Sequence, residues 1–144
     1  MARGRRGARR LAVQALYQRQ LTGHDAPELL AQFVERKEYR GIDTAYFAAL
    51  IHEILPQEAA LDEIIATAAD RPVAQLDPVE HSILWIGVSE LINHADVPST
   101  VVIDEAINLC REFGAQDGYR YVNAILDGLV ARLRGSEGAA TAGG

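Results

Sequence analysis

The chain has 144 residues, the length of one ordinary domain, and this is long enough to bury a hydrophobic core. Half of its residues are apolar (49%) and a quarter are charged (24%), a balance typical of globular proteins that argues against a disordered chain. The formal net charge is −6, the single cysteine excludes an internal disulfide, and no apolar run reaches the roughly 18 residues that span a membrane. We therefore expect a cytoplasmic protein without membrane contact.

The first helix that we expect runs from about Ala8 to Thr22, because Gly4 and Gly7 weaken a helix that starts earlier. Residues 1–24 contain six arginines and no acidic residue, whereas the other 120 residues contain 8 basic and 20 acidic side chains. The six arginines are Arg3, Arg5, Arg6, Arg9, Arg10 and Arg19. Because guanidinium groups bind phosphate and stack on unpaired bases, this basic arm on an acidic body indicates a nucleic-acid ligand.

The spacing of these arginines predicts a shared surface. Arg6, Arg9 and Arg10 are three or four residues apart, so a helix places them on one face. Tyr17 lies further along the same helix, and an exposed aromatic ring beside basic residues stacks single-stranded bases. Composition alone leaves an alternative open, in which the arginines are a solvated chain start and Tyr17 belongs to the core.

Three more helices are expected before residue 70. The second starts at Asp25, with Glu28 completing a capping box, and the third starts at Asp43. Pro56 ends the third helix or opens the fourth, because proline does not fit a helix interior. The apolar residues that we expect to face the core are Leu29, Leu30, Phe33, Val34, Phe47, Leu50, Ile51, Ile54, Leu55, Leu61, Ile64, Ile65 and Ala68.

The strongest helix start is the run Asp77–Glu80, which offers a cap, a proline in the first turn and a carboxylate three residues on. This fifth helix is apolar on nearly all sides and is expected at the centre of the core. Ser99 caps a sixth helix, and Asp117 starts a seventh that Gly135 ends. Strand signals are scarce, so the predicted fold is all-α with about seven helices.

Catalytic and metal-binding patterns are not indicated. The four histidines lack metal-ligand spacing, and Cys110 lies in an apolar stretch without an activating histidine nearby in sequence. Acidic pairs such as Asp62-Glu63 are more typical of solvated helix faces than of acid–base catalysts. We therefore expect neither an enzyme nor a cofactor. Trp85, the only tryptophan, fits equally a core residue and an aromatic anchor at a protein interface.

Three stretches in matching order resemble one family, the NusB transcription antitermination factors. They are residues 5–17 (RRGARRLAVQALY), residues 79–107 with Val79-Glu80, Glu90-Leu91 and Asp96-Val97-Pro98, and residues 113–127 with Phe113-Gly114 and Tyr121-Val122-Asn123. Together they cover roughly residues 5–133. The resemblance implies one domain over residues 1–134 with two packed helical groups, and residues 135–144 are expected to form a flexible tail of glycine and alanine.

The resemblance also implies a function and partners. A NusB-like protein binds the boxA element of nascent ribosomal RNA leaders, together with the ribosomal protein NusE, and helps RNA polymerase resist termination. By matching position, Arg5, Arg6, Arg9, Tyr17, Asp117 and Tyr121 resemble RNA-binding residues of the family, and the basic arm adds Arg3 and Arg10 to the predicted site. Glu80 matches the NusE-binding face, on which Trp85 and Ser89 replace the basic residue and the tyrosine that are common in the family.

Two other hypotheses stay open beside this one. An exposed Trp85 would suit self-association, and a dimerising helical adaptor without sequence-specific RNA binding is the alternative function. A ribosomal RNA cytosine methyltransferase carries a similar N-terminal helical domain, but 144 residues leave no room for its cofactor-binding α/β domain.

Overall fold

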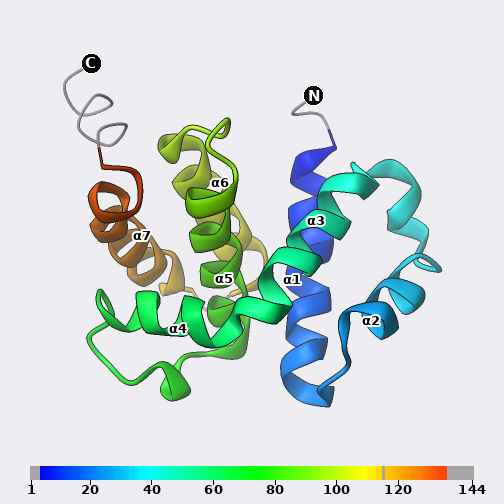
Figure 1. Ribbon diagram of the computed structural model, residues 1–144, viewed down its shortest axis with the longest axis horizontal. Coiled ribbons are helices and arrows are strands. Elements are labelled where there is room, and N and C mark those ends of the chain that lie inside the picture. Colours follow the sequence, from blue (N-terminus) through cyan, green and yellow to red (C-terminus); the bar gives the residue numbers. More distant parts are fainter. Residues whose placement is uncertain (1–3, 115, 136–144) are drawn as a thin grey trace. The chain divides into compact units, whose positions relative to one another are not determined.

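This computed structural model describes residues 4–114 and 116–135. These residues contain seven α-helices and three short 3₁₀ helices, joined by turns (Figure 1). No strand occurs among those residues, so the predicted all-α class is confirmed. The α-helices are α1 (Arg5–Thr22), α2 (Ala26–Phe33), α3 (Thr44–Ile54), α4 (Glu58–Ala66), α5 (Pro78–Asn93), α6 (Ser99–Phe113) and α7 (Gly118–Arg134). The 3₁₀ helices are η1 (Lys37–Gly41), η2 (Leu55–Gln57) and η3 (Val73–Gln75).

The helices form two compact units, which are Met1–Glu58 and Ala59–Gly144. The boundaries predicted from the sequence, 1–134 for a single domain and 135–144 for a tail, stay predictions. Of the predicted tail, only Gly135 belongs to the described residues.

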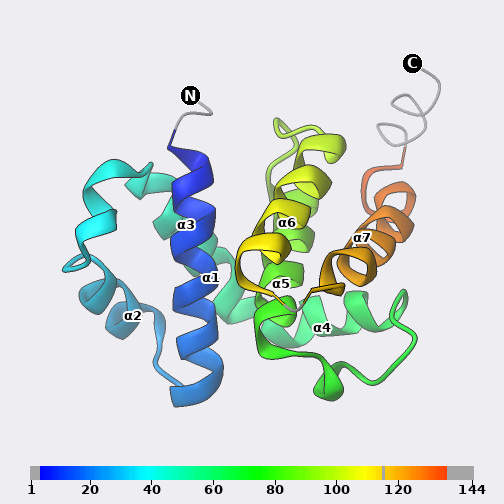
Figure 2. The ribbon, with the colours of Figure 1, turned by 180° about the vertical axis from the view of Figure 1, so that it is seen from behind.

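The first unit is built around the packing of α1 against α3, with α2 and η1 beside them (Figure 2). Leu11 and Leu16 of α1 are buried, as the apolar spacing predicts. Phe33 of α2 and Phe47 of α3 are also buried, with their ring centroids 6.2 Å apart. The expected capping box of Asp25 is present, and the Asp43 carboxylate accepts from the Tyr46 N–H at 3.0 Å.

The first helix begins at Arg5, one turn earlier than the prediction of a start near Ala8. Gly4 has a φ of 92°, a left-handed conformation that glycine adopts without strain, and its carbonyl accepts from the N–H groups of Ala8 and Asp43 at 3.0 Å each. Gly7 lies within the helix where Ile42 packs, and a Cβ there would come within 2.6 Å of Ile42 Cγ2. A close contact with the 42–43 segment therefore offsets the weak helix propensity of the glycines.

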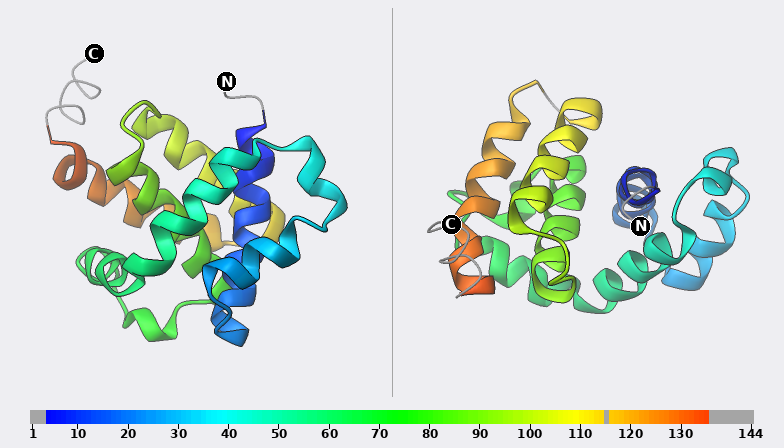
Figure 3. Two further views of the ribbon diagram at one scale, coloured as in Figure 1. Left: turned by 45° about the vertical axis from the view of Figure 1, so that its right-hand side comes forward. Right: turned by 90° about the horizontal axis from the view of Figure 1, so that it is seen from above.

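The second unit is centred on α5, which packs against α6 and α7 (Figure 3). Ile83, Leu84, Ile86, Val88 and Leu91 of α5 are all buried, which confirms its predicted central position. Asp77 caps this helix by accepting from the N–H groups of Val79 and Glu80.

One predicted side-chain cap in the second unit is wrong. Ser99 is the first residue of α6 instead of its cap, and its side chain is buried. Pro98 precedes it, and this proline has no side-chain acceptor with which to cap the helix. Asp117 lies at the start of α7 as predicted, and its carboxylate makes no capping hydrogen bond.

Two arginines donate hydrogen bonds to backbone carbonyls at the C-terminal ends of helices. In the first unit, the Arg19 guanidinium pairs with the Glu58 carboxylate at 3.1 Å and donates to the Gly23 carbonyl at 2.7 Å. In the second unit, Arg134 donates to backbone carbonyls at the end of α5 and just beyond it, those of Glu90, Leu91, His94 and Val97. The last carbonyls of a helix lack donors within the helix, and Arg134 of α7 provides hydrogen-bond donors for those of α5.

Replacing Arg134 with alanine is expected to lower the free energy of unfolding by about 2 kcal/mol, because hydrogen bonds from charged donors contribute about 1.5–3 kcal/mol. The control is Arg132→Ala, which removes an exposed arginine from the same turn and is expected to change stability by less than about 0.5 kcal/mol. Urea unfolding followed by circular dichroism measures both. Equal effects of the two variants would contradict the capping role of Arg134.

Candidate RNA-binding surface

The arginines of α1 divide into two pairs. Arg5 and Arg9 lie one turn apart on the side that faces α3, with their guanidinium carbons 4.3 and 5.5 Å from the centroid of the Tyr46 ring. Arg5 is half-buried, and Arg9 is only 4% exposed. The prediction that Arg9 shares an exposed face with its neighbours is therefore wrong, because cation–π packing against α3 holds its side chain in the interior.

The second pair, Arg6 and Arg10, is exposed. Tyr17 follows seven residues after Arg10, close to two helical turns, and it is 39% exposed. The structure thus places two arginines and an aromatic ring along one accessible face of α1. Arg3 was also predicted to bind RNA, but it lies outside the described residues.

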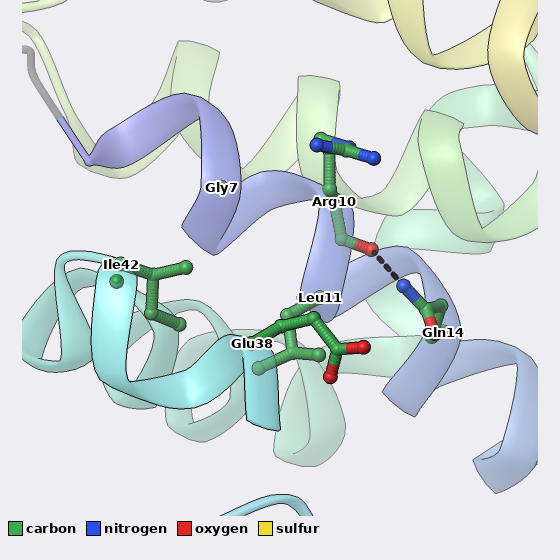
Figure 4. A pocket seen from close by; sticks show the side chains of 7 residues that line it. Gly7, Arg10, Leu11, Gln14, Glu38 and Ile42 are labelled. Atoms are coloured by element: carbon green, nitrogen blue, oxygen red, sulfur yellow. Dashed lines mark hydrogen bonds between the residues drawn. The ribbon is translucent and has the colours of Figure 1, made fainter. Parts of the chain in front are cut away.

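A pocket of about 230 Å³ lies beside this face, between α1 and η1 (Figure 4). Its α1 side is formed by Gly7, Arg10, Leu11 and Gln14, and its other side is formed by Glu38, Gly41 and Ile42. The Gln14 side-chain amide donates to the Arg10 carbonyl at 3.4 Å, and the Gln14 side-chain oxygen accepts from the Arg36 guanidinium at 3.0 Å. These contacts join the arginine-rich face of α1 to the segment that leads into η1.

Further cations in this segment were not singled out from the sequence. Arg36, Lys37 and Arg40 are exposed and line a second hollow of about 310 Å³. The Arg36 guanidinium lies 4.3 Å from the centroid of the Phe33 ring, which restrains its position. The run RKEYR at residues 36–40 is visible in the sequence as a local excess of positive charge, but only the fold shows that it borders α1.

Asp117 and Tyr121, the RNA-binding residues predicted in the second unit, differ in accessibility. Asp117 is exposed just before α7. Tyr121 is half-buried, with the Arg71 guanidinium 4.2 Å from its ring centroid. Tyr119 was not predicted, yet its ring lies 4.8 Å from the Arg111 guanidinium carbon. An arginine–tyrosine pair of this kind has the chemistry to bind phosphate, and its two members come from different helices, so sequence spacing alone did not indicate it.

Trp85 is a buried residue, with only 4% of its surface exposed. Its indole N–H donates to the Asp62 carboxylate of α4 at 2.8 Å, and its ring lies 4.3 Å from the His81 ring, centroid to centroid. The interpretation of Trp85 as an exposed anchor is therefore wrong, because α4 supplies a hydrogen-bond partner for the indole. This removes the feature that favoured self-association.

Glu80 is also buried, and it lies against the start of α7. Its side chain is 8% exposed, and a Cβ at Gly118 would collide with its carboxylate. Burial raises the pKa of Glu80, and the nearby Asp77 charge adds to the increase, whereas Arg71 opposes it. A NusE-binding role for Glu80 and Trp85 stays a prediction, and their burial means that such a role would act through the packing of α4, α5 and α7.

The thiol of Cys110 shows no sign of activation. Burial raises its pKa to about 12, so it is a neutral thiol at pH 7. In the described parts of the chain, no three histidine, cysteine or acidic side chains gather to hold a metal ion. None of the helices described here has the length and apolar character to cross a membrane.

The buried carboxyl of Glu80 predicts a pH dependence of stability. Because its pKa is raised in the folded protein, folding favours the protonated form, and this contribution to stability is lost as the pH rises above the ordinary value of 4.5 and through the raised pKa. Glu80→Gln cannot ionise, so its unfolding free energy relative to the unmodified protein should increase from pH 4 to pH 7.

The control for this experiment is Glu63→Gln, which removes an exposed carboxylate from α4. Chemical unfolding at several pH values measures the differences. A Glu80→Gln difference that stays constant with pH would contradict the expected coupling.

Comparison with known proteins identifies the family. The model of the NusB family matches residues 6–131. The transcription antitermination protein NusB of Shewanella amazonensis is 48% identical over 128 residues, which cover 89% of this chain and 96% of that protein. Among solved structures, NusB of T. maritima superposes with a TM-score of 0.83 at 23% identity, covering 94% of this chain and 96% of that one. A NusB chain from a complex of the antitermination factors NusB and NusE with double-stranded RNA has a TM-score of 0.83 at 27% identity, covering 92% of this chain and 99% of that one. The chain belongs to the NusB family.

Proposed function

We propose that this protein is a transcription antitermination factor that binds a boxA-type element in nascent ribosomal RNA leaders together with NusE, and so helps RNA polymerase resist termination. It acts in the cytoplasm as an RNA-binding adaptor without catalysis of its own. The family supports this proposal, as does the solved complex in which a structurally similar NusB chain occurs with NusE and RNA. The observation that carries it is the exposed face of α1 that bears Arg6, Arg10 and Tyr17.

This face has the chemistry that single-stranded RNA requires. Arg6 and Arg10 are one helical turn apart, so both guanidinium groups can reach neighbouring phosphates of one strand. An exposed tyrosine such as Tyr17 offers a ring on which an unpaired base stacks. Phosphate contacts supply affinity, whereas stacking requires bases that are not paired.

The distribution of charge favours the first unit as the primary site of RNA attraction. Residues 1–58 contain 9 basic and 7 acidic side chains, whereas residues 59–144 contain 5 basic and 13 acidic side chains. A surface with an excess of cations attracts a polyanion, and one with an excess of carboxylates repels it. We therefore assign the electrostatic part of RNA binding to α1 and its neighbours, and Arg3 belongs to this proposed site by its position in the sequence.

Tyr121 and Asp117 belong to the proposal as residues of the second unit. Asp117 is exposed, and its ionised carboxylate can accept hydrogen bonds but cannot donate them. It therefore suits the donor groups of a base or of NusE and not a phosphate. Tyr121 is held beneath Arg71, and this contact leaves the cation of Arg71 exposed. Glu80 and Trp85 complete the proposal as residues that shape the NusE-binding face from within.

The double variant Arg6→Ala/Arg10→Ala is expected to bind a single-stranded boxA-type RNA at least about tenfold more weakly at 50 mM salt. Each phosphate contact on a single strand contributes about 0.7 to the slope of log K against log salt, so loss of two contacts makes the slope shallower by about 1.4. Fluorescence anisotropy between 50 and 200 mM salt, with and without NusE, measures both quantities.

Two single variants serve as controls. Arg132→Ala removes an exposed cation from α7 and is expected to leave the salt slope within experimental error. Arg9→Ala is expected to lower the free energy of unfolding by about 1–2 kcal/mol, because a buried cation–π and packing contact is lost. An unchanged slope for the double variant, in a protein that remains folded, would contradict the assignment of α1 as the RNA-binding face.

A further inference from the structure

We propose that the pocket between α1 and η1 binds one unpaired guanine base of the RNA, and that the Glu38 carboxylate selects this base. The inference rests on the proposed RNA-binding function and adds to it a site of base selection. Three features carry the proposal: the size and lining of the pocket, an acceptor at its rim, and cations on the two segments that form it.

Part of the pocket wall is apolar. Leu11, which is 1% exposed, and the half-buried Ile42, which packs against Gly7, provide its apolar surface. Its volume of about 230 Å³ is smaller than the roughly 300–1,000 Å³ of pockets that hold drug-sized ligands, so its size suits a single small group. Apolar surface of this kind is favourable for one face of a nucleobase.

The polar groups at the rim differ in what they can offer a ligand. Gln14 uses both ends of its amide within the protein, since one end donates to the Arg10 carbonyl and the other accepts from Arg36. Glu38 is exposed, and its carboxylate forms no hydrogen bond or ion pair with any part of the chain that the structure describes. Figure 4 shows Glu38 and Ile42 on the η1 side of the pocket and Leu11 on the α1 side. Glu38 is thus the acceptor that a ligand would meet.

A carboxylate at this position discriminates among the four bases. It accepts hydrogen bonds only, so it matches a base edge that presents donors. The Watson–Crick edge of guanine presents two adjacent donors, N1–H and the N2 amino group, which the two oxygens of one carboxylate can accept together. Adenine and cytosine present one amino group beside an acceptor nitrogen, and uracil presents N3–H between two carbonyl oxygens. The carboxylate also repels phosphate, so the base and not the backbone occupies the pocket.

Cations flank the pocket where the strand would enter and leave. Arg10 lines the pocket on the α1 side. Arg36, Lys37 and Arg40 line the second hollow along η1, and Arg36 also donates to Gln14 of this pocket. Contacts of these side chains with phosphates on either side of a nucleotide would fix the register of the strand, and the pocket then reads one base. A carboxylate surrounded by cations is a poor general site for a polyanion, but it is a good site for a base whose phosphates are held nearby.

The test uses the full-length protein and three 11-nucleotide RNAs that differ at one position. Each is a run of uridines with a central guanosine, inosine or uridine, and inosine lacks only the N2 amino group of guanosine. Anisotropy titrations are carried out with the unmodified protein, Glu38→Gln, and Glu35→Gln. Glu35 is an exposed carboxylate three residues earlier that does not line this pocket, so its variant matches the change in charge.

The unmodified protein should bind the guanosine RNA about fivefold or more tightly than the inosine and uridine RNAs, since a good bidentate base contact discriminates by about that factor or more. Glu38→Gln should reduce this ratio to near one, while Glu35→Gln should retain it. A ratio near one in the unmodified protein, or its retention in Glu38→Gln, would overturn the base pocket while leaving the proposed function intact. Failure of all three RNAs to bind at 50 mM salt would also overturn the base pocket, whereas the proposed function is tested separately by the titration of boxA-type RNA with and without NusE.

Discussion

The ring of Tyr46 lies against the guanidinium groups of Arg5 and Arg9, and the rest of the candidate site depends on this contact. It takes one side of the arginine cluster into the packing of α1 on α3. The adjacent side, with Arg6 and Arg10, is then presented to solvent in a fixed orientation, because α1 cannot rotate without breaking the packing. The same contact therefore stabilises the first unit and selects which arginines meet a ligand.

The close approach of the 42–43 segment to α1 has a second consequence. Ile42 packs where Gly7 has no side chain, and this contact brings η1 alongside the helix. The cations that precede η1 and lie within it thereby border the exposed face of α1, although about 30 residues separate them from Arg6 in the sequence. A larger residue at position 7 would displace Ile42 and close or distort the pocket between the two segments.

The helices and the exposed aromatic residue of α1 were predictable, because caps, proline positions and apolar spacing act locally. Asp25 and Asp77 cap their helices as expected, and Tyr17 is exposed as expected. The buried state of Arg9 was not predictable, since helical spacing shows that arginines share a face but not that Tyr46 covers part of it. The choice between a core role and an interface role for Trp85 was undecided for the same reason. Its partner Asp62 lies 23 residues earlier, and only tertiary packing brings the two together. The start of α1 was predicted too late because the low helix propensity of Gly4 and Gly7 takes no account of the contact with Ile42.

The most direct test of the divided arginine cluster observes the arginine side chains themselves. Nuclear magnetic resonance of ¹⁵N-labelled protein resolves the Nε–H signals of individual arginines while a boxA-type RNA is added. The account predicts that the signals of Arg6 and Arg10 shift in proportion to bound RNA, while those of Arg5 and Arg9 stay close to their free positions. Shifts of Arg5 and Arg9 as large as those of Arg6 and Arg10 would contradict it.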